Sequence, residues 1–120
     1  MKTASIRIER NTAVSLVRAR KDFAGAWRSG KEHGAQFSFE SPAALFRALT
    51  PVRWTLLERL QALGPSTLRG LARALERDVK AVHRDVHALL ELGLMERDAK
   101  GLLRLPFERI HAEFDLAETA

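Results

Sequence analysis

The feature that most constrains the fold is a pair of short amphipathic helices predicted around one brief turn. In residues 68–75, leucine and alanine recur at helical spacing, and Thr67 before them is a suitable N-cap. A second helix is predicted over residues 79–92 with Asp78 as its N-cap, so only residues 76–78 separate the two helices. Two helices joined by so few residues have the spacing of a helix-turn-helix, which presents its second helix outward.

The second of these helices has two chemically different sides. The residues expected to be buried recur every three to four positions and are Val79, Val82, Val86, Leu89, Leu90 and Leu92. The opposite side carries Lys80, His83, Arg84 and His87, mostly in the N-terminal half of the helix. Gly93 is expected to end the helix, because glycine takes a left-handed conformation without steric cost. Core packing therefore explains the apolar stripe and leaves the polar stripe unexplained.

Short alternating segments predict strands after this helix. Residues 94–97 and 102–105 are expected to pair as a hairpin, or wing, around the turn-rich residues 98–101. Residues 110–114 alternate again and predict a further strand, packed either on the wing or on N-terminal strands. Pro106 is expected to mark the edge between the hairpin and this strand.

The front of the chain predicts further elements of both kinds. Residues 5–8 and 36–40 alternate as strands, and an amphipathic helix that includes Phe23 and Trp27 is expected between them. Further helices are predicted over residues 42–49 and 51–63, because a proline stands at the start of each. The apolar stripe of the latter is Val52, Leu56, Leu57, Leu60 and Leu63, and Trp54 beside it is expected to pack in the core. The fold class is therefore α+β.

The helical segments resemble a known family. Residues 49–60 (LTPVRWTLLERL), 67–75 (TLRGLARAL), 78–86 (DVKAVHRDV) and 92–94 (LGL) are similar to winged helix-turn-helix transcriptional regulators of the broad MarR type. More closely, they resemble small prokaryotic DNA-binding proteins that act as the antitoxin or regulator of a two-component operon. The resemblance implies binding of double-stranded DNA, usually by a homodimer on a pseudo-palindromic operator.

Three segments follow from the pattern and the resemblance together. Residues 1–40 are expected to form a strand-helix-strand extension for dimer or partner contact, residues 41–115 the winged helix-turn-helix, and residues 116–120 an acidic tail. Two residues depart from the family pattern. Gly70 stands where such helices often carry Glu, which removes half of a capping box. Glu76 stands where the turn often has Gly, so either a longer turn or mild backbone strain is expected there.

Composition narrows the function further. The net charge of +5 and the isoelectric point near 10.4 favour a polyanionic partner, although a basic composition also fits a protein that is merely soluble. With no cysteine, the chain has no thiolate metal site and no cysteine nucleophile. The sequence also lacks a Gly-rich phosphate loop and a G-x-S-x-G elbow, so we expect no enzyme and no cofactor. Without an apolar span or a signal peptide, a cytoplasmic protein with no membrane contact is expected.

The DNA-binding residues expected on this basis come from both helices and the wing. Arg84 is the leading candidate, because a guanidinium can bond guanine O6 and N7 together. Asp85 is expected to turn away from DNA, since a carboxylate repels phosphate. The full candidate set is Thr67, Arg69, Lys80, Ala81, His83, Arg84, His87, Arg97 and Lys100.

Each interpretation has an alternative. The polar stripe can be an ordinary solvated helix face, and the tip of the wing an ordinary charged turn. His83 and His87 have a spacing that could hold a metal, but no third ligand is evident, so no metal is expected. Phe23 and Trp27 fit either a dimer or partner contact or packing on the same chain. A different class of function is a protein-binding module that sequesters a partner such as a toxin; double-stranded RNA fits a recognition helix poorly.

Overall fold

The α+β class expected from the sequence is confirmed by the computed structural model, which describes residues 2–9 and 34–116. The helices and strands of the described residues are β1 (Thr3–Ile8), β2 (Gln36–Phe39), α2 (Pro42–Ala48), α3 (Pro51–Leu63), α4 (Leu68–Leu75), α5 (Val79–Leu92), β3 (Glu96–Arg97), β4 (Leu103–Arg104) and β5 (Arg109–Ala112). The helix expected around Phe23 and Trp27 lies outside the described residues. No helix in the described part of the chain is long and apolar enough to span a bilayer.

The chain divides into two compact units. The sheet unit comprises residues 1–47 and 109–120, and the helical unit comprises residues 48–108. The last strand, β5, belongs to the sheet unit because it pairs with β1. Of the two positions expected for this strand, the structure therefore selects the N-terminal strands over the wing.

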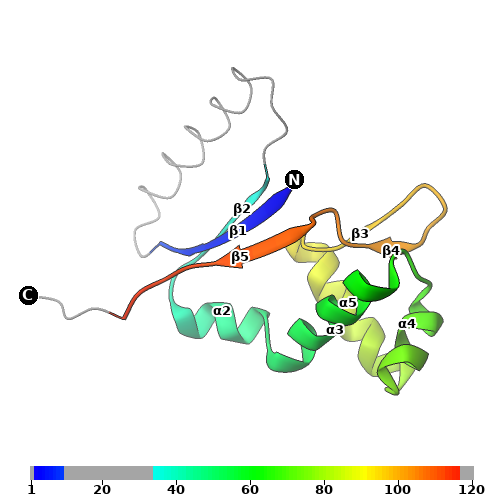
Figure 1. The fold of residues 1–120 in the computed structure, drawn as a ribbon. Helices are drawn as coiled ribbons and strands as arrows, with labels where there is room; N and C mark the ends of the chain where they lie inside the picture. The colour runs from blue at the N-terminus through cyan, green and yellow to red at the C-terminus, as the bar shows by residue number, and fades with distance from the viewer. Residues whose placement is uncertain (1, 10–33, 117–120) are drawn as a thin grey trace, which may run out of the picture. The chain divides into compact units, whose positions relative to one another are not determined.

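In the sheet unit, β1 lies between β2 and β5, and both neighbours run parallel to it (Figure 1). The register pairs Ile6 with Phe37 and Ala4 with Ile110, so apolar side chains from all three strands share one face. Ala4 and Ile6 are fully buried, whereas Arg7 on the other face is exposed. A parallel pair needs a crossover connection of a dozen or more residues, and residues 9–35 between β1 and β2 are long enough to provide one.

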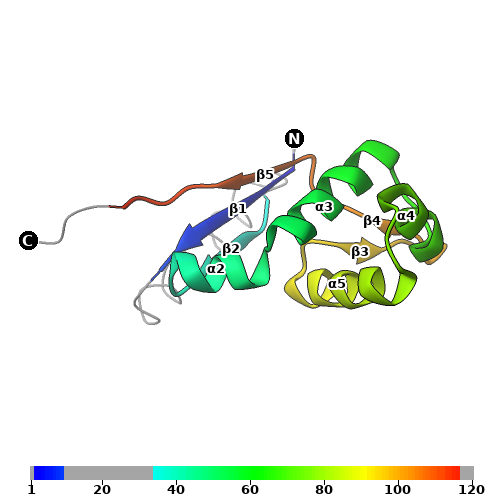
Figure 2. The same ribbon diagram turned by 90° about the horizontal axis from the view of Figure 1, so that it is seen from below.

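In the helical unit, α3 begins and ends where the sequence signals place it. The Thr50 hydroxyl caps the helix by accepting a hydrogen bond from the Arg53 N–H at 3.2 Å, and Gly64 stops it with a φ of 81°. Leu56, Leu57 and Leu60 are buried as expected. The core of the unit is completed by side chains of the other elements, namely Leu71, Ala72, Val82, Val86, Leu89, Leu94, Met95, Leu103 and Phe107. Figure 2 shows α4 at the end of this unit, beside α3 and α5.

Three core assignments on α3 were wrong. Val52 is 50% exposed, Leu63 is 46% exposed and Trp54 is 37% exposed. Val52 and Leu63 lie in the first and last turns of the helix at the margin of its buried stripe, and Trp54 lies outside that stripe. The helical period gives the direction of a side chain but not the depth of the protein around it.

The hairpin follows α5 as expected, with shorter strands. β3 and β4 pair antiparallel, with Glu96 opposite Arg104. Leu94 and Met95, which were expected in the first strand, precede β3 and are buried in the core. The turn is held by Asp98, whose Oδ1 accepts hydrogen bonds from the Lys100 and Leu102 N–H groups, each at 2.9 Å. The hairpin is consistent with a wing.

The start of β2 depends on a glycine. A Cβ on Gly34 would lie 1.3 Å from the Thr3 carbonyl oxygen, which is backbone and cannot rotate away. One residue later, the Ala35 carbonyl oxygen accepts a hydrogen bond from the Ser5 N–H at 2.9 Å. The close approach of the two chain segments therefore requires Gly34.

We expect Gly34→Ala to destabilise the sheet unit by about 1–3 kcal/mol, because the methyl group forces β1 and β2 apart. Amide hydrogen exchange measures the effect: exchange in β1 should accelerate while exchange in α3 stays the same. Ser38→Ala, at an exposed position of β2, is the matched control. Unchanged protection of β1 in Gly34→Ala would contradict the steric argument.

Candidate nucleic-acid interface

The turn between α4 and α5 is built by three residues. Glu76 ends α4 in the left-handed conformation, with φ 54° and ψ 44°, and its N–H reaches the carbonyl oxygens of Ala72 and Arg73. Asp78 then starts α5, where its Oδ2 accepts a hydrogen bond from the Ala81 N–H at 3.3 Å. The predicted bounds of both helices are confirmed. Of the two outcomes expected at Glu76, a longer turn or a strained one, the structure has the short turn with a left-handed residue. The chain reverses in three residues because a non-glycine residue takes a conformation that normally favours glycine.

At the other end of α4, Gly70 has a structural role that the sequence pattern did not reveal. The Thr67 hydroxyl caps the helix by accepting a hydrogen bond from the Gly70 N–H at 3.0 Å. A Cβ on Gly70 would lie 3.0 Å from that same hydroxyl oxygen, which is an unusually tight contact. Gly70 therefore cannot supply the second hydrogen bond of a capping box, but it leaves space for the Thr67 hydroxyl to approach the helix closely.

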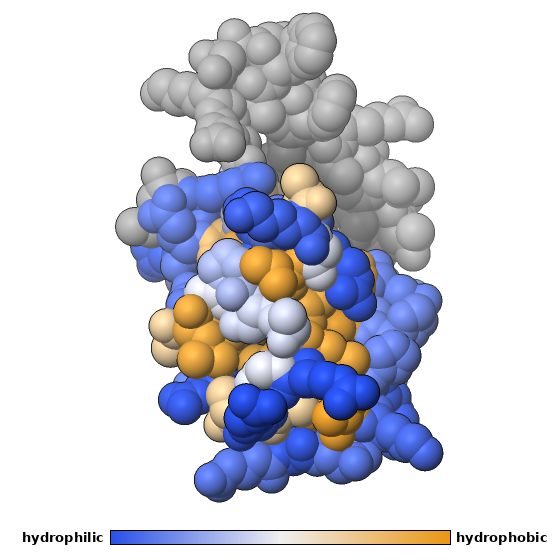
Figure 3. Space-filling view, turned by 90° about the vertical axis from the view of Figure 1, so that its right-hand side faces the viewer, coloured by the Kyte–Doolittle hydropathy of each residue, from blue (hydrophilic) through white to orange (hydrophobic). Residues whose placement is uncertain are grey.

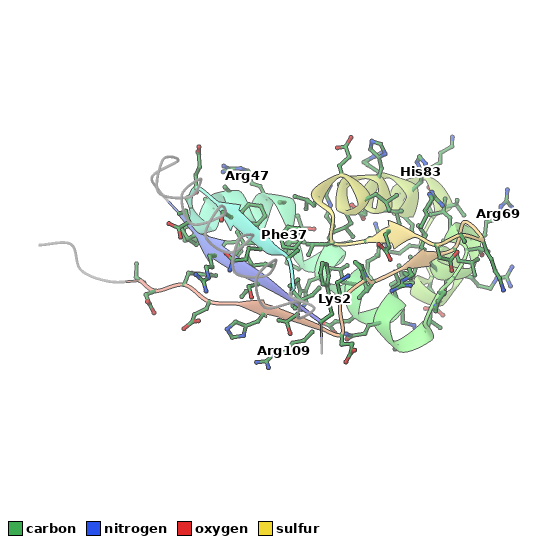
Figure 4. All side chains as sticks on the ribbon, turned by 90° about the horizontal axis from the view of Figure 1, so that it is seen from above. Lys2, Phe37, Arg47, Arg69, His83 and Arg109 are labelled. Atoms are coloured by element: carbon green, nitrogen blue, oxygen red, sulfur yellow. The ribbon has the colours of Figure 1, made fainter. Side chains whose placement is uncertain are left out.

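The polar stripe of α5 faces away from the core of the helical unit. Lys80, His83 and Arg84 are exposed, while Ala81 between them is half-buried. The opposite stripe is fully buried at Val82, Val86 and Leu89. Val79 was expected in the core but is 38% exposed, because it occupies the first turn of α5 beyond the buried stripe. Figure 4 shows His83 projecting outward from α5.

The cations of this stripe are available to bind a ligand. Within the described part of the chain, neither Lys80 nor Arg84 forms an ion pair or a side-chain hydrogen bond. His87 differs, because its Nε2 lies 3.1 Å from Glu91 Oε1, one turn further along the helix. Among residues 2–9 and 34–116, no group of three or more His, Asp or Glu side chains is close enough to hold a metal ion.

The remaining candidates lie on α4 and the hairpin. Arg69 is exposed and projects from α4 (Figure 4), and Thr67 is exposed at the start of that helix. On the hairpin, Lys100 is exposed at the turn, and Arg97 donates from Nη1 to the Gly101 carbonyl oxygen at 3.3 Å. All nine candidates belong to the helical unit.

Figure 3 views the side of the helical unit that carries α4 and the hairpin tip, with hydrophilic residues around a central group of apolar ones. The neighbouring hollow of about 430 Å³, lined by residues that include Leu60, Pro65 and Phe107, contains none of the nine candidates.

Asp85 of α5 forms an ion cluster with Arg53 and Arg77, which the sequence did not predict. Asp85 Oδ1 accepts a hydrogen bond from Arg53 Nε of α3 at 3.0 Å, and Asp85 Oδ2 accepts one from Arg77 Nη2 of the turn at 2.8 Å. Burial alone would raise the pKa of Asp85, but the hydrogen bonds and positive charges of Arg77 and Arg53 outweigh it and hold this pKa below its usual value. Asp85 is therefore ionised and directed toward the other elements of its own unit.

Comparison with known proteins adds a family. The family model described as HVO_A0114 matches residues 48–112, which is more than half of the chain. No curated protein and no solved structure matches the chain. The matched segment includes α3, α4, α5 and the hairpin, and so contains all nine DNA-binding candidates but neither Phe23 nor Trp27.

We expect Glu76→Gly to stabilise the protein by about 0.5–1 kcal/mol, because it removes the steric cost of a left-handed residue and adds a smaller entropy cost. Thermal unfolding measures the change as a higher Tm. Glu76→Ala is the matched control, since it removes the same carboxylate but keeps the Cβ and should give no such gain. Equal stabilisation by both variants would mean that the charge, and not the backbone, limits stability at this turn.

Proposed function

The chain belongs to the HVO_A0114 family, and we propose that it is a sequence-specific double-stranded DNA-binding transcriptional regulator. In this proposal α4, the turn and α5 form a helix-turn-helix, β3 and β4 are its wing, and the fold is a winged helix-turn-helix with an N-terminal extension. The observation that carries the proposal is the stripe of Lys80, His83 and Arg84, which is exposed directly after a three-residue turn and has cations without partners in the described chain.

The chemistry of this stripe suits the major groove of B-form DNA. An α-helix fits that groove, and the first two turns of a recognition helix are the part that reaches base edges. Arg84 can contact guanine with two parallel hydrogen bonds, while Lys80 and His83 can contact phosphate or a base edge. Ala81 is small and half-buried between them, so the backbone of α5 can approach the DNA closely.

Residues outside α5 would position the protein on the backbone of the duplex. Arg69 and Thr67 of α4 can contact phosphate, and Arg97 and Lys100 of the wing can contact phosphate or the minor groove. His87, which is paired with Glu91, would lie at the margin of the interface. Affinity should come mainly from phosphate neutralisation and fall steeply with salt, while specificity should come from α5.

The simplest regulator of this kind is a cytoplasmic repressor that acts as a homodimer on a palindromic operator. Two recognition helices about 34 Å apart would then enter successive major grooves on one side of the duplex. The same architecture fits the antitoxin of a toxin–antitoxin operon that also represses its own genes.

A second function, binding of a partner protein, is favoured by an apolar surface of the sheet unit. Phe46 is 56% exposed, Phe114 is 38% exposed and Leu116 is fully exposed. The rings of Phe46 and Phe114 lie edge to face with centroids 6.0 Å apart. Exposed aromatic clusters of this kind are typical of protein contacts, so this surface can serve a second copy of the chain or a partner such as a toxin.

We expect Arg84→Ala to weaken binding to a specific duplex by about tenfold, because it removes a bidentate base contact worth about 1–3 kcal/mol. The probe is the duplex that the unmodified protein selects from a random-sequence library, titrated by fluorescence anisotropy against a shuffled duplex. Arg59→Ala, at an exposed position of α3, is the charge-matched control. Equal losses in both variants, or an unchanged sequence preference in Arg84→Ala, would contradict the assignment.

If the surface of Phe46 and Phe114 serves a second copy of the chain, the double variant Phe46→Ser, Phe114→Ser should lose self-association, because it removes the exposed aromatic rings. Sedimentation velocity would show a shift from the dimer toward the monomer mass. Val52→Ser, another exposed apolar position, is the matched control on the helical unit. A dimer that persists in the double variant would show that this surface does not carry self-association.

A further inference from the structure

The Arg53–Asp85–Arg77 cluster joins three separate parts of the helical unit. Each carboxylate oxygen of Asp85 has its own guanidinium donor, one from α3 and one from the turn before α5. Arg53 also donates from Nη1 to the Ala48 carbonyl oxygen at 2.9 Å, so one side chain connects α5 to the residue where the helical unit begins. The side chains are mostly buried, with exposed fractions of 14% for Asp85, 20% for Arg53 and 27% for Arg77.

The apolar contacts of α5 do not fix its orientation in the same way. The buried stripe consists of aliphatic side chains, and the hydrophobic effect that buries them is non-directional. Hydrogen bonds between guanidinium and carboxylate groups are short and directional, and these two approach Asp85 from different elements. They therefore restrict both rotation of α5 about its axis and movement along it.

Asp85 lies next to Arg84 in the sequence, at the boundary between the buried and exposed sides of α5. A rotation of the helix there would move Arg84 and His83 together. A base contact tolerates little displacement, because a bidentate guanidinium must match two acceptors of one base. A phosphate contact tolerates more, because it is largely electrostatic.

We propose that Asp85, held by Arg53 and Arg77, is a positioning residue for sequence reading: it sets the orientation of α5 and contacts no DNA. This inference rests on the proposed function. In this inference the cluster contributes to sequence specificity and not to overall DNA affinity. Buried ion pairs in general add little net folding stability, and in some proteins they fix the orientation of an element instead. Losing the cluster should relax base discrimination and leave phosphate binding intact.

Asp85→Asn tests the inference, because it keeps the shape of the side chain and removes its charge. The matched control is Glu58→Gln, which changes the net charge equally at an exposed position of α3. For the unmodified protein and both variants, the affinities for the library-selected duplex and for a shuffled duplex are measured over a range of salt concentrations. Amide hydrogen exchange of the free proteins reports the order of α5 separately.

In Asp85→Asn we expect the ratio of specific to non-specific affinity to fall by about tenfold, the worth of one base contact. Affinity for the shuffled duplex and its salt dependence should match those of Glu58→Gln, and exchange should accelerate in the first two turns of α5. A ratio equal to that of Glu58→Gln would overturn the inference, as would equal losses of specific and non-specific affinity.

Arg53→Lys is a second variant for the case in which Asp85→Asn does not fold. Lysine keeps the charge but lacks the planar fork that contacts Ala48 and Asp85 together. The ratio of specific to non-specific affinity is expected to fall here too, but by less than in Asp85→Asn. An unaltered ratio would overturn the inference. If the unmodified protein itself showed no preference for any duplex, the proposed function would fail first, and that result is visible without any variant.

Discussion

Burial of one aliphatic stripe on α5 determines which side of that helix faces solvent. Val82, Val86 and Leu89 are each no more than 1% exposed, and burying such side chains contributes about 1.5–3 kcal/mol each. Because the helical period is 3.6 residues, hiding these positions forces Lys80, His83 and Arg84 to the opposite side. The exposed basic stripe is thus a geometric consequence of the core.

Two further features determine where that stripe begins. The left-handed Glu76 reverses the chain within three residues, so the first turn of α5 follows α4 immediately. The Thr67 and Asp78 caps each satisfy one of the unpaired N–H groups in the first turn of their helix, those of Gly70 and Ala81. The N-terminal half of α5, where the cations are, therefore follows α4 after only three residues.

The sequence predicted local structure well where a single residue had a strong conformational preference. The threonine, aspartate and glycine signals around α4 and α5 gave the observed helix bounds, and the Asp98 turn gave the hairpin. Burial was less predictable: Trp54 was expected to pack in the core from its place beside an apolar stripe and Val79 from helical spacing, yet Trp54 lies outside the buried stripe of α3 and Val79 lies in the exposed first turn of α5. The partner of β5 was also open, since an alternating strand does not specify which neighbour it pairs with.

The ion cluster shows a different limit of the sequence. Arg53 and Asp85 are 32 residues apart, and neither belongs to a motif that would link them. Their contact arises only when α3 and α5 pack in the same unit, which no local pattern encodes. From the sequence, Asp85 was expected to turn away from DNA because its charge repels phosphate. The structure shows which groups it turns toward, namely the guanidinium groups of Arg53 and Arg77.

Selection of duplex DNA from a random-sequence library by the unmodified, full-length protein tests the central claim most directly. A homodimer that reads DNA with α5 should enrich one sequence with two inverted half-sites about 10 base pairs apart from centre to centre. That sequence should bind more tightly than a shuffled duplex even at physiological salt. If no sequence were enriched, and all binding disappeared as salt was raised, the exposed stripe would be a non-specific polyanion surface and the account would be contradicted.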